Sequence, residues 1–155
     1  MPSEDGIGME LDETDVKILK MLLSDARLSS RKIARKTGVS VGTVLSRMKK
    51  MEQERIIKEY SAVVDYEKLG YDLTAVIEIT VSKGKLSEMA KEVAKVPNVC
   101  CVYNVTGLTD ALVIAKFRKR EELSSFTKYL LTLPSVERTN THVVLTTMKE
   151  DFRVI

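Results

Sequence analysis

The sequence predicts an α+β protein in two parts: a winged-helix-like helix-turn-helix domain, then a ferredoxin-like βαββαβ domain. Apolar residues recur at helical spacing in three successive segments before residue 56. Beyond about residue 73 the pattern alternates strand, helix, strand, strand, helix, strand. Residues 95–99 and 132–136 end the two helices of this part with the same Pro-x-Val motif. This weak internal repeat indicates a duplicated βαβ unit.

The domain boundaries follow from changes in these patterns. We expect residues 1–9 to form a flexible tail and residues 10–58 the helix-turn-helix domain. Residues 59–72 are expected to supply a connecting strand and hinge, and residues 73–150 the C-terminal domain.

The first helix is expected to begin after Asp12, a good N-cap residue, and to end near Ser24. Asp15 suits the positive end of the helix dipole. Its apolar face comprises Leu11, Ile18, Leu19, Leu22 and Leu23.

The second and third helices are separated by a short break. Ser29 or Ser30 should cap the second helix, Gly38 should end it in the left-handed conformation, and Ser40 should cap the third. The third helix is expected over residues 41–55. Its predicted apolar stripe is Val41, Val44, Leu45, Met48 and Met51.

Residues 56–65 are β-rich, and we expect a short hairpin arm or connecting strand there. Residues 67–72 have the composition of a hinge. Strands are predicted at 73–82, 99–105, 111–117 and 136–147, and helices at 85–96 and 120–133. The residues expected to face inward from these helices are Leu86, Met89, Ala90, Val93, Ala94, Leu123, Phe126, Leu130 and Leu131.

Positive charge is concentrated around the second and third helices. Residues 26–51 contain eight Lys or Arg and no Asp or Glu, although the whole chain has a net charge of only +3. A helix-turn-helix that reads double-stranded DNA needs such a surface for phosphates and short polar side chains for base edges. The alternative is a solvated basic face on an ordinary three-helix domain. The residues predicted to contact DNA are Arg31, Lys32, Arg35, Lys36, Ser40, Gly42, Thr43, Ser46, Arg47, Lys49 and Lys50.

Several classes of protein are disfavoured. No stretch approaches the roughly 18 consecutive apolar residues of a membrane span. The acidic N-terminus lacks a hydrophobic signal core, so we expect a cytoplasmic protein without a membrane partner. Cys100 and Cys101 are adjacent and are expected to pack within a strand. With His142 as the single histidine, no catalytic constellation, metal site or cofactor is predicted.

The loop at residues 104–110 gathers polar groups between two apolar strands. Gly107 permits a tight backbone, and Thr106, Thr109 and Asp110 could hold the ammonium group of an amino acid. The alternative is an ordinary hairpin turn, which composition alone favours.

Five separated motifs together resemble the Lrp/AsnC (feast/famine) family of prokaryotic transcription regulators, over about residues 10–150. They are Leu11-Asp12-Glu13-x-Asp15, Ile56-Ile57-Lys58, Leu69-Gly70-Tyr71, Thr106-Gly107-x-x-Asp110 and Val136-Glu137-x-Thr139-x-Thr141. The resemblance implies a C-terminal RAM domain that forms homodimers, and assembly of dimers into tetramers or octamers. It also implies an amino-acid effector bound between dimers, with Asp110 meeting its amino group. The effector residues it implies are Asn104, Val105, Thr106, Gly107, Leu108, Thr109, Asp110, Ser124, Lys128, Thr139, Asn140 and Thr141.

Two alternative functions remain open on the sequence. Some siroheme decarboxylases share this scaffold, but the C-terminal half offers one histidine and only the short basic run 118–120 for an anionic tetrapyrrole. The other alternative is an architectural DNA-binding protein with little sequence preference.

Overall fold

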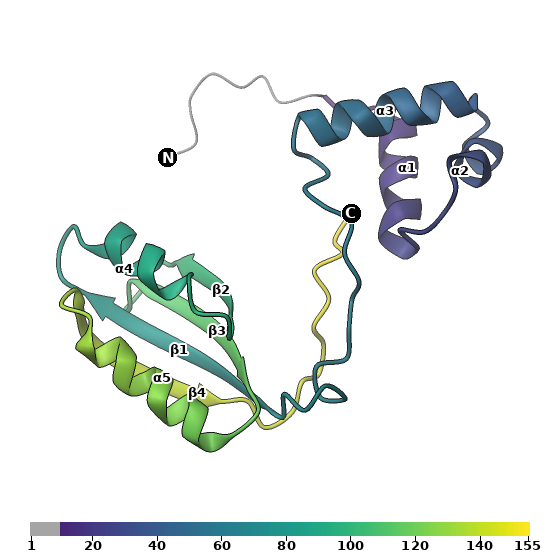
Figure 1. Ribbon diagram of the computed structural model, residues 1–155. Coiled ribbons are helices and arrows are strands. Elements are labelled where there is room, and N and C mark those ends of the chain that lie inside the picture. Colours follow the sequence, from purple (N-terminus) through teal and green to yellow (C-terminus); the bar gives the residue numbers. More distant parts are fainter. Residues whose placement is uncertain (1–9) are drawn as a thin grey trace. The chain divides into compact units, whose positions relative to one another are not determined.

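The computed structural model describes residues 10–155. The described chain divides into two compact units, and each has its own hydrophobic core. The first unit contains residues 10–63 and 151–155, and the second contains residues 64–150. Figure 1 shows helices alone in the first unit and a helix-covered sheet in the second. The tail predicted at residues 1–9 lies outside the described residues.

The first unit consists of α1 (Glu13–Ser24), α2 (Ser30–Thr37) and α3 (Val41–Gln53). The predicted caps are confirmed: Asp12, Ser29 and Ser40 each accept a backbone N–H at the start of their helices. Gly38 ends α2 at a φ of 78°, which favours glycine. The buried core of this unit comprises Ile18, Leu19, Leu22, Ile33, Ala34, Val44 and Met51.

The apolar stripe of α3 is narrower than predicted. Val44 and Met51 are buried and Met48 is half-buried, whereas Val41 and Leu45 are exposed. Successive residues lie about 100° apart around a helix, so Leu45 faces away from the side that Val44 presents to the core. Leu23 at the end of α1 is also exposed, because it lies about 100° around the helix from the buried Leu22.

No strand forms at residues 56–65, so the predicted hairpin arm or connecting strand is wrong for the single chain. A strand needs a neighbour to complete its hydrogen bonds, and no described segment pairs with this one. Ile56 and Ile57 instead pack on the helical core, with both their N–H groups donating to the Met51 carbonyl. Residues 66–71, which overlap the hinge predicted at 67–72, form a turn in which Gly70 has a φ of 84°.

The second unit has the predicted βαββαβ order. Its elements are β1 (Leu73–Val81), α4 (Leu86–Val93), β2 (Val99–Asn104), β3 (Ala111–Phe117), α5 (Arg120–Thr132) and β4 (Val136–Val143). The strands form one antiparallel sheet in the order β2-β3-β1-β4. The turns after α4 and α5 repeat: the N–H of Val99 donates to Val96, and that of Val136 to Leu133, at 2.9 and 3.0 Å.

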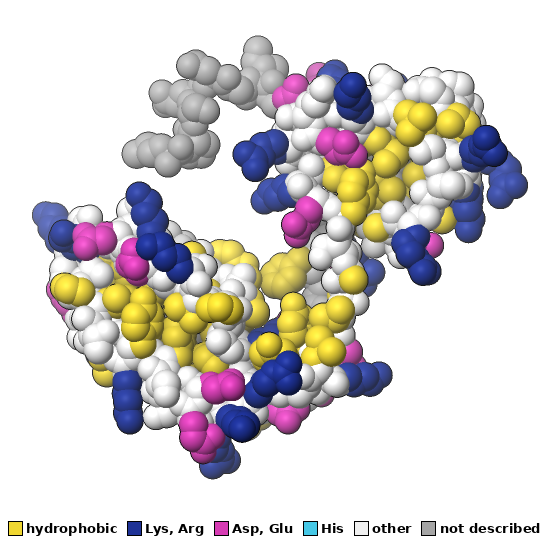
Figure 2. All heavy atoms as spheres, viewed as in Figure 1, with side chains coloured by type: hydrophobic (Ala, Val, Ile, Leu, Met, Phe, Trp, Pro, Cys, Tyr) yellow, Lys and Arg dark blue, Asp and Glu magenta, His cyan; other side chains and the backbone are white. Residues whose placement is uncertain are grey.

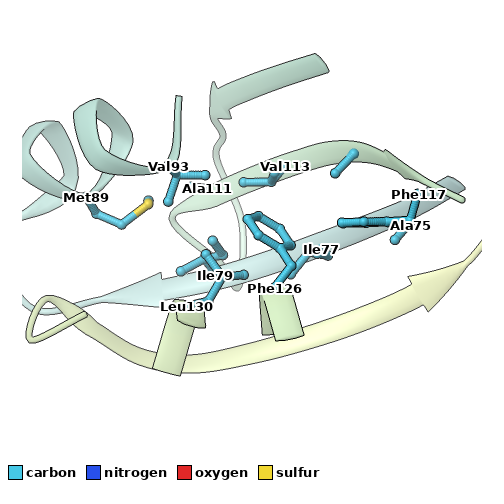
Figure 3. Packing of buried hydrophobic residues seen from close by; sticks show 11 residues of the cluster. Ala75, Ile77, Ile79, Met89, Val93, Ala111, Val113, Phe117, Phe126 and Leu130 are labelled. Atoms are coloured by element: carbon cyan, nitrogen blue, oxygen red, sulfur yellow. The ribbon is translucent and has the colours of Figure 1, made fainter. Parts of the chain in front are cut away.

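Helices α4 and α5 cover one face of the sheet (Figure 1). Side chains from β1, β3 and both helices meet there, as Figure 3 shows for Ile77, Val113, Met89 and Phe126. No helix among residues 10–155 covers the opposite face, which we call the open face. Its half-buried and exposed side chains include Val76, Glu78, Leu112, Ile114, Asn140 and His142, which alternate with the core residues along their strands.

Four details of this unit differ from prediction. Strand β4 ends at Val143 rather than residue 147: the N–H of Val144 still donates to the Thr74 carbonyl, but residues 144–147 are not paired with β1 in the sheet. Ala94 lies beyond the end of α4 and is exposed, and Leu131 is exposed on the outer side of α5. Cys100 is exposed on the edge strand β2, whereas Cys101 is half-buried.

Candidate nucleic-acid interface and effector loop

The residues predicted to contact DNA lie on α2, α3 and the turn between them. All are exposed except Thr43 and Arg47, which are half-buried. Among the described residues, no ion pair engages the cations Arg31, Lys32, Arg35, Lys36, Lys49 or Lys50. Figure 2 shows Lys and Arg side chains standing out from this unit. These six side chains are free to neutralise phosphates.

The start of α3 is fixed by its cap. The Ser40 hydroxyl accepts the N–H of Thr43 at 3.0 Å and is hydrogen-bonded to the Thr43 hydroxyl at 2.8 Å. Gly42 lies between them, and a Cβ added there would meet only the Ser40 oxygen, at 3.8 Å. A side chain at position 42 would therefore project from the surface where a DNA backbone could otherwise approach closely.

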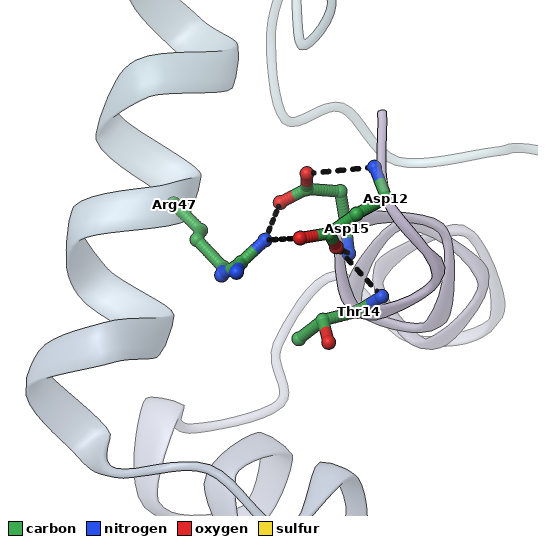
Figure 4. Close-up of polar contacts among 4 residues, drawn as sticks. All are labelled: Asp12, Thr14, Asp15 and Arg47. Carbon is green, nitrogen blue, oxygen red and sulfur yellow. Dashed lines mark hydrogen bonds and ion pairs between the residues drawn. The ribbon is translucent and has the colours of Figure 1, made fainter. Parts of the chain in front are cut away.

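Arg47 on α3 is engaged within the protein (Figure 4). Its Nη1 lies 2.5 Å from Asp12 Oδ2 and 2.9 Å from Asp15 Oδ1. The other oxygens of these carboxylates serve the cap of α1: Asp12 Oδ1 accepts from Thr14 and Asp15 backbone N–H, and Asp15 Oδ2 accepts from that of Asp12. All four carboxylate oxygens are thus used, and two ion pairs from Arg47 tie α3 to the start of α1.

These contacts shift the pKa values of Asp12 and Arg47. The backbone N–H of Asp15, and then the Arg47 guanidinium, hold the pKa of Asp12 below its ordinary 3.8. The same two carboxylates, Asp15 first, raise the pKa of Arg47. The Asp15 side chain is only 3% exposed, and Arg47 is its charged partner. DNA contact by Arg47 stays a prediction, and the structure gives this residue a second role in holding α3.

The loop at residues 104–110 is tied to the end of β1 by its own polar groups. Asp110 Oδ2 accepts the N–H of Val81 at 2.8 Å, and the Thr109 hydroxyl donates to the Ile79 carbonyl at 2.8 Å. Gly107 has a φ of 124°, and the neighbouring Leu108 is fully exposed. The loop is held in place before any ligand arrives, and one oxygen of Asp110 already has a partner.

Only some of the other implied effector residues lie near this loop. Thr139 and Thr141 pair with Ile79 and Ile77 across β1, so Thr139 flanks the same residue that Thr109 binds from the other side. Asn140 belongs to the open face and donates to Glu78 at 2.9 Å.

Ser124 and Lys128 are exposed on α5. No described hydrogen bond or ion pair joins either residue to the loop. The cavities of about 360 and 470 Å³ in this unit are lined by other residues. Amino-acid binding at the loop therefore stays a prediction.

Comparison with known proteins assigns both units. The family model for the Lrp/AsnC ligand binding domain matches residues 74–154, and the one for winged helix-turn-helix DNA-binding matches residues 11–58. The chain belongs to the Lrp/AsnC family. This Lrp/AsnC protein is a DNA-binding transcription regulator, and the names of its relatives describe regulators rather than enzymes.

Three similar proteins span nearly the whole chain. An uncharacterized HTH-type transcriptional regulator of Pyrococcus furiosus is 49% identical over 94% of this chain and 99% of its own. A transcriptional regulator of Neisseria meningitidis, solved in complex with L-methionine, has a TM-score of 0.86 at 30% identity, covering 94% and 97% of the two chains. LrpC of Bacillus subtilis has a TM-score of 0.81 at 29% identity, covering 92% and 100%.

Within residues 10–155, no group of three or more His, Cys, Asp or Glu side chains could hold a metal ion. None of the described helices is long and apolar enough to cross a membrane.

Sequence analysis missed two polar clusters. One is the set of carboxylates that holds Arg47. The other surrounds Lys116 on β3, which is buried although charged. Its signal in the sequence is a single lysine within the otherwise apolar strand Ala111–Phe117. Sequence spacing identifies Asp12 as an N-cap and Asp15 as suited to the helix dipole, but it does not show that both bind Arg47.

Proposed function

We propose that this regulator acts as a dimer that reads a pseudo-palindromic DNA site with two helix-turn-helix units, and that an amino acid adjusts its DNA affinity. The observation that carries the proposal is the set of cations on α2 and α3 that form no ion pair within residues 10–155, next to the capped start of α3. In such dimers the two recognition helices enter successive major grooves, roughly 34 Å apart. A regulator of this kind acts where chromosomal DNA is, so a cytoplasmic location forms part of the proposal.

The open face supports dimer formation. Val76, Leu112 and Ile114 form an apolar centre on it, with Glu78 and His142 beside them. A sheet with one apolar face uncovered gains stability when a second sheet packs against it. The homodimer would build on this face, and tetramers or octamers would use further surfaces.

The effector part of the proposal rests on the loop at residues 104–110. Its backbone is preorganised by Thr109 and Asp110, and the Neisseria regulator of the same fold was solved with L-methionine. Because the single chain leaves Leu108 fully exposed, the remaining wall would come from another copy. Footprints on the protein's own upstream DNA, with and without a panel of amino acids, test this part.

A mobility-shift titration over about 50 to 200 mM salt tests DNA binding. Replacing Lys36 or Lys50 by Met should weaken binding and lower the salt dependence by about one released counterion each. The matched control is Lys20→Met, an exposed lysine on α1 without an ion pair among the described residues. Unchanged salt dependence in both test variants would contradict the proposed surface. Equal affinity for upstream and random DNA would favour the architectural alternative.

A further inference from the structure

Lys116 is the most deeply buried cation of the second unit, with a side chain only 9% exposed. It projects from β3 on the side of the open face, opposite Thr74 on β1. Its ammonium group lies 3.3 Å from the Thr74 hydroxyl and 3.1 Å from the Glu150 carboxylate. The ring of Tyr66 lies beneath it, 5.2 Å from ring centre to nitrogen.

These partners come from three separate segments: the hinge, the sheet and the chain after β4. Together they border a cavity of about 360 Å³, whose wall is formed by parts of residues 64–74, by Lys116 and by residues 144–150. This volume is within the range of small-molecule sites. None of the residues implied for the effector lines it.

The counter-ion of Lys116 is weakly constrained. Glu150 belongs to the segment after Val143, which has no regular secondary structure. Its neighbours Leu145 and Met148 are more than 90% exposed. The Glu150 side chain is itself 37% exposed. Lys116 and Thr74, by contrast, stand on paired strands. The cationic half of the site therefore stands on the paired sheet, whereas the anionic half stands on a segment without regular secondary structure.

We infer that the Lys116 cavity binds small organic carboxylates, and that Glu150 is an internal occupant which such a ligand displaces. The ligand's carboxylate would take the place of Glu150 at the Lys116 ammonium and the Thr74 hydroxyl. Its apolar part would lie against the rings of Tyr66 and Tyr71, which meet edge to face at 5.9 Å. Binding would release residues 144–150 from the hinge. This inference does not depend on an effector at residues 104–110.

Glu150 competes with a free ligand for Lys116 as part of the same chain. A carboxylate on a short flexible segment has an effective concentration in the millimolar range at its partner. A free carboxylate sees only the fraction of sites that Glu150 leaves open, which lowers its apparent affinity. Removing the charge of Glu150 should therefore tighten ligand binding, whereas removing that of Lys116 should abolish it.

Calorimetric titration with phenylacetate, phenylalanine and phenethylamine tests the inference, since these probes share a ring and differ in charge. We expect phenylacetate to bind the full-length protein and phenethylamine not to bind. Glu150→Gln should tighten phenylacetate binding roughly tenfold, and Lys116→Met should remove it. The controls are Glu137→Gln and Lys83→Met, both exposed residues of the same unit. Hydrogen exchange of residues 144–150 should accelerate when phenylacetate is bound.

The results separate this site from the effector loop. Phenylalanine binding that disappears in Lys116→Met supports the inference. Phenylalanine binding that survives in Lys116→Met, without any phenylacetate binding, belongs to another site and overturns it. Preference for phenethylamine, or no tightening in Glu150→Gln, would also overturn it. Glu150→Gln alters only a partly exposed side chain, so its result stands even where Lys116→Met fails to fold.

Discussion

At the scale of single residues, one arginine joins stability to DNA recognition. Arg47 lies on α3 among side chains predicted to face DNA, yet its guanidinium bridges Asp12 and Asp15 at the start of α1. Asp15 is buried, and a buried charge without a partner is strongly destabilising. The recognition helix is therefore held at a fixed position by the same carboxylates that cap its neighbour.

Arg47→Met should raise the pKa of Asp12 toward 3.8 without restoring it fully, because the backbone N–H of Asp15, the larger cause, remains. A carboxyl group whose pKa is lower in the folded than in the unfolded protein stabilises the fold at pH values above its unfolded pKa. This stabilisation is lost as the pH falls through the folded pKa. In the variant this stabilisation should be smaller, and its loss should be complete at a higher pH. NMR titration of the Asp12 carboxyl group checks the pKa.

Lys49→Met is the control for this change, because Lys49 is exposed on the same helix. It should leave the pKa of Asp12 and the midpoint of urea unfolding unchanged, whereas Arg47→Met should lower that midpoint. An unchanged Asp12 pKa in Arg47→Met would show that the ion pair does not form in solution.

At the scale of elements, two glycines of the helix-turn-helix have opposite roles. Gly38 has a φ of 78°, which an L side chain rarely adopts, while Gly42 lies in the first turn of α3 with open space around it. Glycine is required at the first position by backbone geometry. At the second, it costs helix stability and keeps the surface of α3 clear.

Gly38→Ala should therefore lower the free energy of unfolding by about 1 kcal/mol, and Gly42→Ala should raise it by about 0.5 kcal/mol. Urea unfolding of the two variants measures both effects. Gly42→Ala should nevertheless weaken DNA binding in mobility shifts, because the added methyl group projects from the start of α3. Tighter DNA binding in Gly42→Ala would exclude close approach at this position.

The elements of the fold could be predicted largely because local signals agree with tertiary structure. Asp12, Ser29 and Ser40 mark helix starts by hydrogen bonds to nearby backbone N–H groups, which sequence spacing reveals. The end of β4 could not be predicted, because the apolar pattern continues past Val143 although the pairing with β1 stops there. The Arg47 and Lys116 clusters join residues more than 30 positions apart, and no local pattern encodes such pairs.

At the scale of the whole molecule, the sheet has one face that no helix of the described chain covers. The apolar side chains of Val76 and Ile114 lie at its centre, directly paired across β1 and β3. A proposed dimer that buries this face should therefore respond strongly to a charge introduced there, and weakly to one introduced on the outer side of the helices.

Ile114→Asp should shift the protein from dimer to monomer at micromolar concentration, as measured by sedimentation velocity. A buried, unpaired carboxylate at the centre of an interface costs more than the contacts it replaces. Ser87→Asp, at an exposed position of α4, is the control and should leave the mass unchanged. A dimeric Ile114→Asp variant would place the interface elsewhere, and DNA binding measured alongside would show whether the two properties are separable.

The strand order β2-β3-β1-β4 also has a consequence for biosynthesis. β1 pairs with β3 and β4, so Ala75 finds one of its partners only at Val143. Sheets built from such distant pairings fold slowly, whereas helical units with local contacts fold fast. As the chain leaves the ribosome, α1–α3 can fold while β3 and β4 are still being made. A newly made molecule would thus have a folded helix-turn-helix unit before it has the sheet needed to pair with a second copy.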